Sequence, residues 1–153
     1  MFAMNQRMGE KYREVATKEP PEIDQRLSEI AKSGFEFRNG CHFLKLLQPT
    51  NTNVNENSFP DRTGYECFAN SIHIDDYATT NYLAHGILFV REVFETWNAQ
   101  GHECELVAVF SLDECGLKIR LHTKRLDEQW IDDNLEGYEE AVLVVDSSEM
   151  PGV

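Results

Sequence analysis

The sequence has 153 residues, of which 41% are hydrophobic and 10% aromatic, and its formal net charge at pH 7 is −13. This length and composition suit one domain with a single hydrophobic core. No window approaches eighteen consecutive apolar residues, which argues against a membrane-spanning helix. The acidic excess disfavours direct binding to nucleic acid or to an anionic membrane.

The N-terminus and the cysteines indicate the compartment. The opening MFAMNQRMGEKYREV lacks a basic segment followed by an apolar one, so we expect no export. The four cysteines are widely spaced, with no Cys-x-x-Cys pair, and a domain of this size does not need disulfides. We therefore expect reduced cysteines in a cytoplasmic protein.

The first predicted elements are a helix and a hairpin. Residues 22–33 place their apolar side chains on one helical face, and Gly34 suits the C-terminal cap. The apolar runs 35–38 and 41–48 are joined by Asn39-Gly40. This dipeptide favours a type I′ turn, in which both central residues have positive φ.

A long polar loop and the longest helix follow. Residues 49–65 contain four Asn and two Pro, and connections of this length are usually functional or disordered. Residues 66–74 are predicted to form a strand. Apolar residues then recur at helical spacing over about 78–99, with one of the aspartates at 75–76 as the expected N-cap.

The last part of the chain predicts a hairpin over residues 104–125, a short helix over 127–136 and a strand over 138–146. The expected fold class is therefore α+β, a single domain over 1–153 with a largely antiparallel sheet packed by a central helix. An N-terminal helix and a short C-terminal helix complete it. Residues 1–18 carry no predicted element and are the candidate flexible segment.

No known catalytic fingerprint is present, so we predict no catalytic residue, no metal and no cofactor. His73, Asp75 and Asp76 offer one alternative, a small metal-dependent hydrolase. Hard cations need six or more oxygen ligands, whereas an aspartate before a helix commonly caps it. The capping interpretation is therefore preferred at this position.

A row of basic side chains offers a second alternative. One face of the predicted strand after position 116 carries Lys118, Arg120, His122 and Lys124. This row would suit a regulatory domain that binds a phosphate-bearing ligand. The preferred interpretation is a solvent face balanced across the strand pair by Glu103 and Glu105.

Residues 126–149 contain nine acidic side chains and no basic ones. In the predicted helix, Glu128, Asp132 and Glu136 would form a row at i, i+4 and i+8, and such like-charge pairs cost about 0.2–0.5 kcal/mol each. The unfavourable pattern suggests a partner that supplies positive charge. Trp130 and Tyr138 add the large amphipathic side chains that are enriched at binding hot spots.

The stretch FSLDECGLKIRLHTKRLDEQWIDDNLEGYEEAVLVVDS resembles the C-terminal end of small bacterial immunity proteins encoded beside polymorphic toxins, including those of contact-dependent growth inhibition. In these proteins a hairpin precedes an R-x-x-E-x-W-like run, an acidic LE-x-Y turn and an apolar strand. The likeness covers about a quarter of the chain. Its residues are Arg125, Glu128, Trp130, Leu135, Glu136 and Tyr138.

The resemblance implies a cytoplasmic protein without catalysis that binds and neutralises one cognate toxin domain. Many such toxins are nucleases with basic clefts, which an acidic surface would suit. It implies no direct nucleic-acid binding and no membrane. The candidate toxin-binding residues are Asp127, Glu128, Trp130, Asp132, Asp133, Glu136, Tyr138, Glu139 and Glu140. The loop 49–65 is a second candidate contact.

Overall fold

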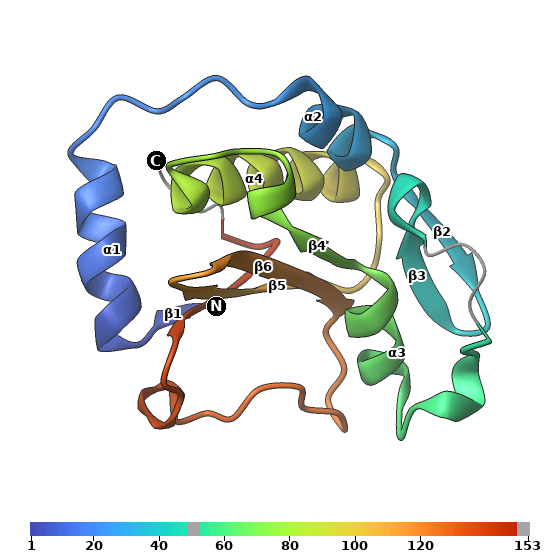
Figure 1. The fold of residues 1–153 in the computed structure, drawn as a ribbon. Coiled ribbons are helices and arrows are strands. Elements are labelled where there is room, and N and C mark those ends of the chain that lie inside the picture. Colours follow the sequence, from blue (N-terminus) through green and yellow to red (C-terminus); the bar gives the residue numbers. More distant parts are fainter. Residues whose placement is uncertain (49–52, 150–153) are drawn as a thin grey trace.

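A computed structural model of the chain describes residues 1–48 and 53–149. Its centre is a five-stranded antiparallel sheet in the order β1-β7-β5-β6-β4, with helix α4 across one face (Figure 1). The α+β class and the largely antiparallel sheet are therefore confirmed. The bounds are β1 Phe2–Met4, β4 Ser71–His73, β5 Leu106–Asp113, β6 Gly116–Thr123, β7 Ala141–Asp146 and α4 Tyr82–Ala99.

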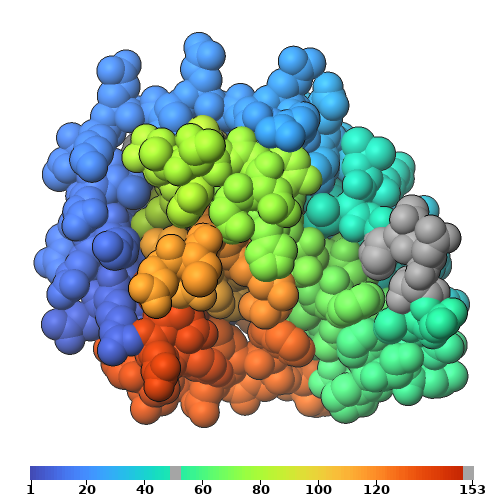
Figure 2. Space-filling view, viewed as in Figure 1, coloured from blue at the N-terminus to red at the C-terminus, as the bar shows by residue number. Residues whose placement is uncertain are grey.

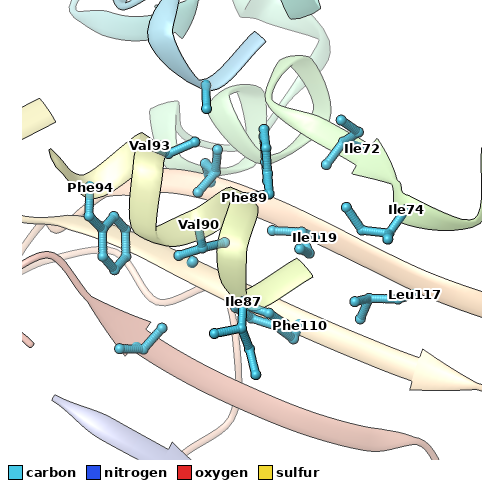
Figure 3. Packing of buried hydrophobic residues seen from close by; sticks show 14 of the residues in the cluster. Ile72, Ile74, Ile87, Phe89, Val90, Val93, Phe94, Phe110, Leu117 and Ile119 are labelled. Carbon is cyan, nitrogen blue, oxygen red and sulfur yellow. The ribbon is translucent and has the colours of Figure 1, made fainter. Parts of the chain in front are cut away.

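Helix α4 supplies much of the core. The apolar residues at helical spacing that predicted it are all buried: Leu83, Ile87, Val90, Phe94 and Trp97. Figure 3 shows several of them against the inner face of the sheet. Gly86 lets the helix approach β6, because a Cβ there would lie 2.5 Å from Leu117 Cδ2 and 3.1 Å from Ile119 Cδ1. The N-cap is Asn81, so the aspartate cap predicted at 75–76 is wrong; both aspartates lie in a 3₁₀ turn, Ile74–Asp76.

The helix and hairpin predicted near residues 22–48 are confirmed with shorter bounds. Helix α2 spans Gln25–Lys32, is capped by Asp24 and ends before Gly34, whose φ is +78°. Strands β2 (Phe35–Arg38) and β3 (Cys41–Leu44) form a separate two-stranded sheet. The turn between them has φ of +54° at Asn39 and +76° at Gly40, as a type I′ turn requires.

Residues 1–18 contain structure that sequence analysis did not predict. Strand β1 pairs with β7, and helix α1 spans Gln6–Ala16. The buried Asn5 joins them: its Oδ1 accepts from Met8 N at 3.0 Å and from Val142 N at 3.1 Å, and its Nδ2 donates to Glu140 O at 2.8 Å. A three-residue strand that pairs with residues about 140 positions away has no local signature.

The strand predicted over residues 66–74 is wrong in its first half. Helix α3 spans Arg62–Ala69, and only Ser71–His73 pair with the sheet. Asp61 begins the helix by accepting from Gly64 N at 2.7 Å. The predicted loop 49–65 is correspondingly shorter: it contains a 3₁₀ turn, Glu56–Ser58, and its residues 49–52 lie outside the described residues.

The helix predicted over residues 127–136 is also wrong. This segment is irregular, apart from one 3₁₀ turn, Leu135–Gly137. It covers the outer face of the sheet, where Val107, Val109, Val142 and Val144 pack against Ile131, Leu135 and Tyr138. In the observed irregular path, all three of these apolar side chains reach the valines. The tertiary contact therefore overrides a weak helical pattern.

Gly86 gives a direct test of the helix–sheet packing. We expect Gly86→Ala to lower the free energy of unfolding by about 1–3 kcal/mol, because overpacking a closed core exceeds the gain in helix propensity. Gly9 in α1 is the matched control, since a Cβ there meets only Met4 Sδ at 3.9 Å. Gly9→Ala should stabilise the protein by up to about 1 kcal/mol in urea denaturation. Equal effects of the two substitutions would contradict the close approach.

Candidate functional site

The acidic loop, defined as residues 126–140, connects β6 to β7 across the sheet face opposite α4 (orange to red in Figure 1). Figure 2 shows this segment at the lower surface, between α1 in blue and the green residues around α3. Its partly buried apolar side chains face the sheet, and most of its carboxylates are exposed. The stretch singled out in the sequence is therefore both part of the packing and part of the surface.

Two of its carboxylates accept hydrogen bonds from backbone amides at helix N-termini. Glu128 Oε1 accepts from Thr63 N in the first turn of α3 at 2.9 Å, and Glu136 Oε1 accepts from Gln6 N at the start of α1 at 2.6 Å. These bonds satisfy helix amides that have no partner within the helix, and the helix dipole favours the negative charge. Burial alone would raise the pKa of Glu128, but the Thr63 hydrogen bonds and the charge of Arg125 lower it on balance.

The predicted row of Glu128, Asp132 and Glu136 on one helix face does not exist, because the loop is not a helix. Asp132 Oδ1 instead accepts from Asn134 N at 3.0 Å, and Asp132 N donates to Tyr138 Oη at 2.9 Å. These bonds hold the loop in its irregular path. Tyr138 therefore acts as a support inside the loop as well as a candidate contact.

The remaining carboxylates face solvent without compensation. Asp133 accepts from Gln129 Nε2 at 3.1 Å, while Asp127 and Glu139 make no hydrogen bond to the described residues. None of these three, nor Asp132, forms an ion pair within the described part of the chain. Glu140 is partly buried. The loop thus presents four exposed negative charges that the domain itself does not neutralise.

A buried ion pair fixes the start of the loop. Arg125 Nη1 donates to Glu66 Oε1 at 2.7 Å and to Thr63 Oγ1 at 3.1 Å. Glu66, which is fully buried, also accepts from His42 N at 2.7 Å and from Thr123 N at 2.9 Å. One carboxylate therefore connects α3, β3, β6 and the acidic loop. Glu66 was not predicted as a functional residue, because a lone glutamate in a predicted strand gives no signal of burial.

A cavity of about 210 Å³ opens between the acidic loop and the outer face of the sheet. Trp130, 42% exposed, lines it, and the Arg120 guanidinium carbon lies 5.8 Å from the centre of the Trp130 ring. Glu128, Asp132 and Asp133 also line it. An exposed aromatic ring, an apolar hollow and carboxylates are thus brought together.

The four basic side chains predicted to form one row, Lys118, Arg120, His122 and Lys124, have different surroundings in the structure. The alternation is confirmed, because Leu117, Ile119 and Leu121 are buried in the core. Lys124 pairs with Glu105 at 3.1 Å, as the cross-strand interpretation expected. His122 is buried, however, and Arg120 lies beside Trp130, so the four residues do not form one continuous solvent face.

One residue of the hydrolase alternative, Asp75, makes a hydrogen bond within the fold. Asp75 Oδ1 accepts from Leu117 N at 3.2 Å. Within residues 1–48 and 53–149, no group of three metal-ligating side chains is placed to hold an ion. All four cysteines are free, and burial raises the pKa of the Cys41 thiol to about 11. No helix in the same residues is long and apolar enough to cross a membrane.

Comparison with known proteins gives a family match. The sequence model of the family described as "Uncharacterized protein PM0498 family" matches residues 3–153. The curated protein of that name from Pasteurella multocida (strain Pm70) is 34% identical over 85 residues, which cover 50% of this chain and 54% of that protein. The chain thus spans about half the length of the curated relative it matches. No solved structure matches the chain.

The Glu66–Arg125 pair generates a stability prediction. Arg125→Met should lower the free energy of unfolding by about 3–5 kcal/mol, because it leaves a buried carboxylate without its counter-charge. Lys124→Met removes the exposed partner of Glu105 and a 3.5 Å contact with Asp146. Asp146 keeps the N-terminal ammonium at 2.8 Å, so this variant should cost only about 0–1 kcal/mol. Chemical denaturation of the two variants measures the contrast, and a small cost at Arg125 would show that the carboxylate is satisfied without it.

Four histidines generate a pH prediction. Burial lowers the pKa of each below the ordinary value of about 6.5, at His42, His85, His102 and His122. The unfolded chain therefore binds these protons at a higher pH than the folded chain, so stability is complete above about pH 6.5 and declines as the pH falls below it. The decline should be at most about 1.4 kcal/mol per pH unit for each histidine.

Denaturation between pH 7.5 and 5.5 measures this decline above the range in which the carboxylates titrate. His122→Asn removes one titrating group and should flatten the dependence of stability on pH, whatever it does to stability at pH 7.5. An unchanged slope in this variant would show that His122 titrates alike in the folded and unfolded chain.

Proposed function

The chain belongs to the uncharacterized protein PM0498 family, and we propose that it is an immunity protein that binds and neutralises a basic toxin domain through its acidic loop. The observation that carries the proposal is the exposed Trp130 ring at a cavity that Asp132 and Asp133 also line, both without an ion-pair partner among the described residues. The resemblance of residues 110–147 to immunity proteins supplies the class of partner.

Charge explains how the partner would be reached. A net charge of −13 and a local group of unpaired carboxylates attract a basic surface over long distances. Such steering raises association rates well above the roughly 10⁵–10⁶ M⁻¹s⁻¹ of unsteered protein pairs. The basic cleft of a nuclease is a surface of the required sign, and covering it would stop the enzyme from binding its substrate.

Packing explains how the complex would be held. Three contacts order the loop before binding. Arg125 holds its start through Glu66, Tyr138 accepts a hydrogen bond from Asp132 N within it, and Glu136 accepts one from Gln6 N at the start of α1. A preformed surface loses little conformational entropy when it binds. Trp130 supplies the large aromatic contact that dominates many interfaces, and the surrounding carboxylates form charge-assisted hydrogen bonds with the partner's cations.

The candidate residues thus divide into two groups. Direct contacts come from Asp127, Trp130, Asp132, Asp133 and Glu139, which are exposed. The others, Glu128, Glu136 and Tyr138, hold the loop to the domain, and the partly buried Glu140 lies at its end. The protein acts in the cytoplasm of the toxin-producing cell, without a catalytic step or a cofactor.

The first experiment is to purify the tagged chain from its native cell at low salt and identify what co-purifies. We expect one basic protein domain, released as the salt concentration rises because exposed charge pairs are screened. The purified domain should be toxic when expressed without the chain and tolerated with it. A captured partner that is acidic, or one held equally at 50 mM and 500 mM salt, would contradict the proposal.

Charge reversal locates the surface. The double variant Asp127→Lys, Asp133→Lys should weaken binding at least tenfold and reduce its salt dependence, with stability nearly unchanged, because neither side chain is paired with a cation. The control, Glu19→Lys with Glu103→Lys, makes the same change of net charge at exposed sites away from the loop. Equal losses in both variants would mean that total charge, and not the acidic loop, determines affinity.

A further inference from the structure

Strand β2 has an open edge. Within the described residues it pairs only with β3, and it lies on the outer side of that strand (Figure 1). The register places Phe37 opposite His42, whose N donates to Glu66 Oε2 at 2.7 Å and whose O accepts from Asn70 Nδ2 at 2.9 Å. Opposite residues in an antiparallel ladder exchange both hydrogen bonds or neither. The amide and carbonyl of Phe37 therefore point away from β3, towards the outer edge.

The two edges of this small sheet differ. Side chains close the edge of β3, where Leu44 N also donates to Asn70 Oδ1 at 2.9 Å. On β2, Phe35 N has one long contact, 3.5 Å from Gln100 Oε1. Outside the ladder with β3, the described residues form no hydrogen bond to the amide or carbonyl of Phe37. Such an edge is a template on which another strand can pair.

The side chains of β2 do not protect this edge. Phe37 is 66% exposed, although it is a large apolar residue. Its neighbours Glu36 and Arg38 form an ion pair at 3.2 Å, and both lie on the other face of the strand. Edge strands are commonly protected by Lys, by Pro or by repelling charges, and β2 has neither Lys nor Pro. Its two charges have opposite signs.

The order of these three residues makes the edge complementary to itself. If two copies of β2 pair antiparallel about Phe37, the amide and carbonyl of each Phe37 bond those of the other. Glu36 of each copy then faces Arg38 of the other copy, so four charges alternate in sign on one face. The two Phe37 rings meet on the opposite face. Cross-strand pairs of both kinds stabilise sheets, and the arrangement is a closed twofold interface.

We propose that two copies of the chain associate through β2, forming a four-stranded antiparallel sheet in the order β3-β2-β2-β3. The edge is short, so the dimer is weak and reversible, with a dissociation constant on the order of 10–100 µM. The net charge of −13 opposes association, but salt at about 0.15 M screens repulsion beyond about 8 Å. The inference does not depend on the proposed function.

Sedimentation velocity of the full chain tests the association. In about 0.15 M salt, the average mass should rise from that of one chain at about 1 µM towards that of two at about 500 µM. A chain that remains monomeric at the highest concentration, or that forms larger species without a limit at two, would overturn the inference.

Reversing the two charges separately tests the register. Glu36→Arg and Arg38→Glu each place like charges opposite one another, so each variant alone should dimerise at least fivefold more weakly. An equimolar mixture of the two variants restores opposite charges at both positions and should recover most of the lost affinity. Mixing cannot rescue a variant that fails to fold. A mixture that dimerises no better than its components would overturn the proposed pairing.

The exposed aromatic ring has its own test. Phe37→Thr keeps a residue that favours strands and removes the central ring, so it should weaken the dimer several-fold. Leu126→Thr is the control, because Leu126 is a fully exposed apolar side chain on the acidic loop. This substitution should leave the dimer unchanged. Equal losses in both variants would show general apolar association and contradict the β2 interface.

Discussion

The buried pair of Glu66 and Arg125 is the interaction on which the rest of the structure depends. A fully buried carboxylate is tolerable only when it is paired and hydrogen-bonded, and Glu66 accepts from the backbone of β3 and β6 as well as from Arg125. The small β2–β3 sheet, helix α3 and the main sheet are thereby fixed in one arrangement. The same pair determines where the chain leaves β6 and begins the acidic loop.

From that point the acidic loop has two physical roles. Its apolar side chains cover valines on the outer face of β5 and β7, and two of its glutamates satisfy amides at the starts of α1 and α3. These contacts stabilise the loop and explain part of its negative charge within the domain. The exposed charges at Asp127, Asp133 and Glu139 have no such internal explanation. Those charges, together with Trp130, are what the proposed partner would recognise.

Elements were predicted correctly where the residues that determine them lie close together in the sequence. The Asn39-Gly40 turn and α4 were predicted because a dipeptide and a 3.6-residue period act within their own segments. Strand β1 and helix α3 were missed, since β1 is defined by pairing with β7 and α3 by packing against β3 and β6. In the acidic loop, the charges and Trp130 were identified, but the predicted helix was wrong, and Glu66, which holds the start of the loop through Arg125, had no predicted role.

The sequence by itself determined the fold class, the periodic elements, the negative charge and the segment in which that charge is concentrated. Each of these depends on composition or on residues close together in the chain. Only the tertiary structure decided which carboxylates are hydrogen-bonded inside the domain and which remain exposed without a cation. Those outcomes depend on burial and on contacts between residues far apart in the sequence, such as Glu66 with Arg125, and no local pattern encodes them.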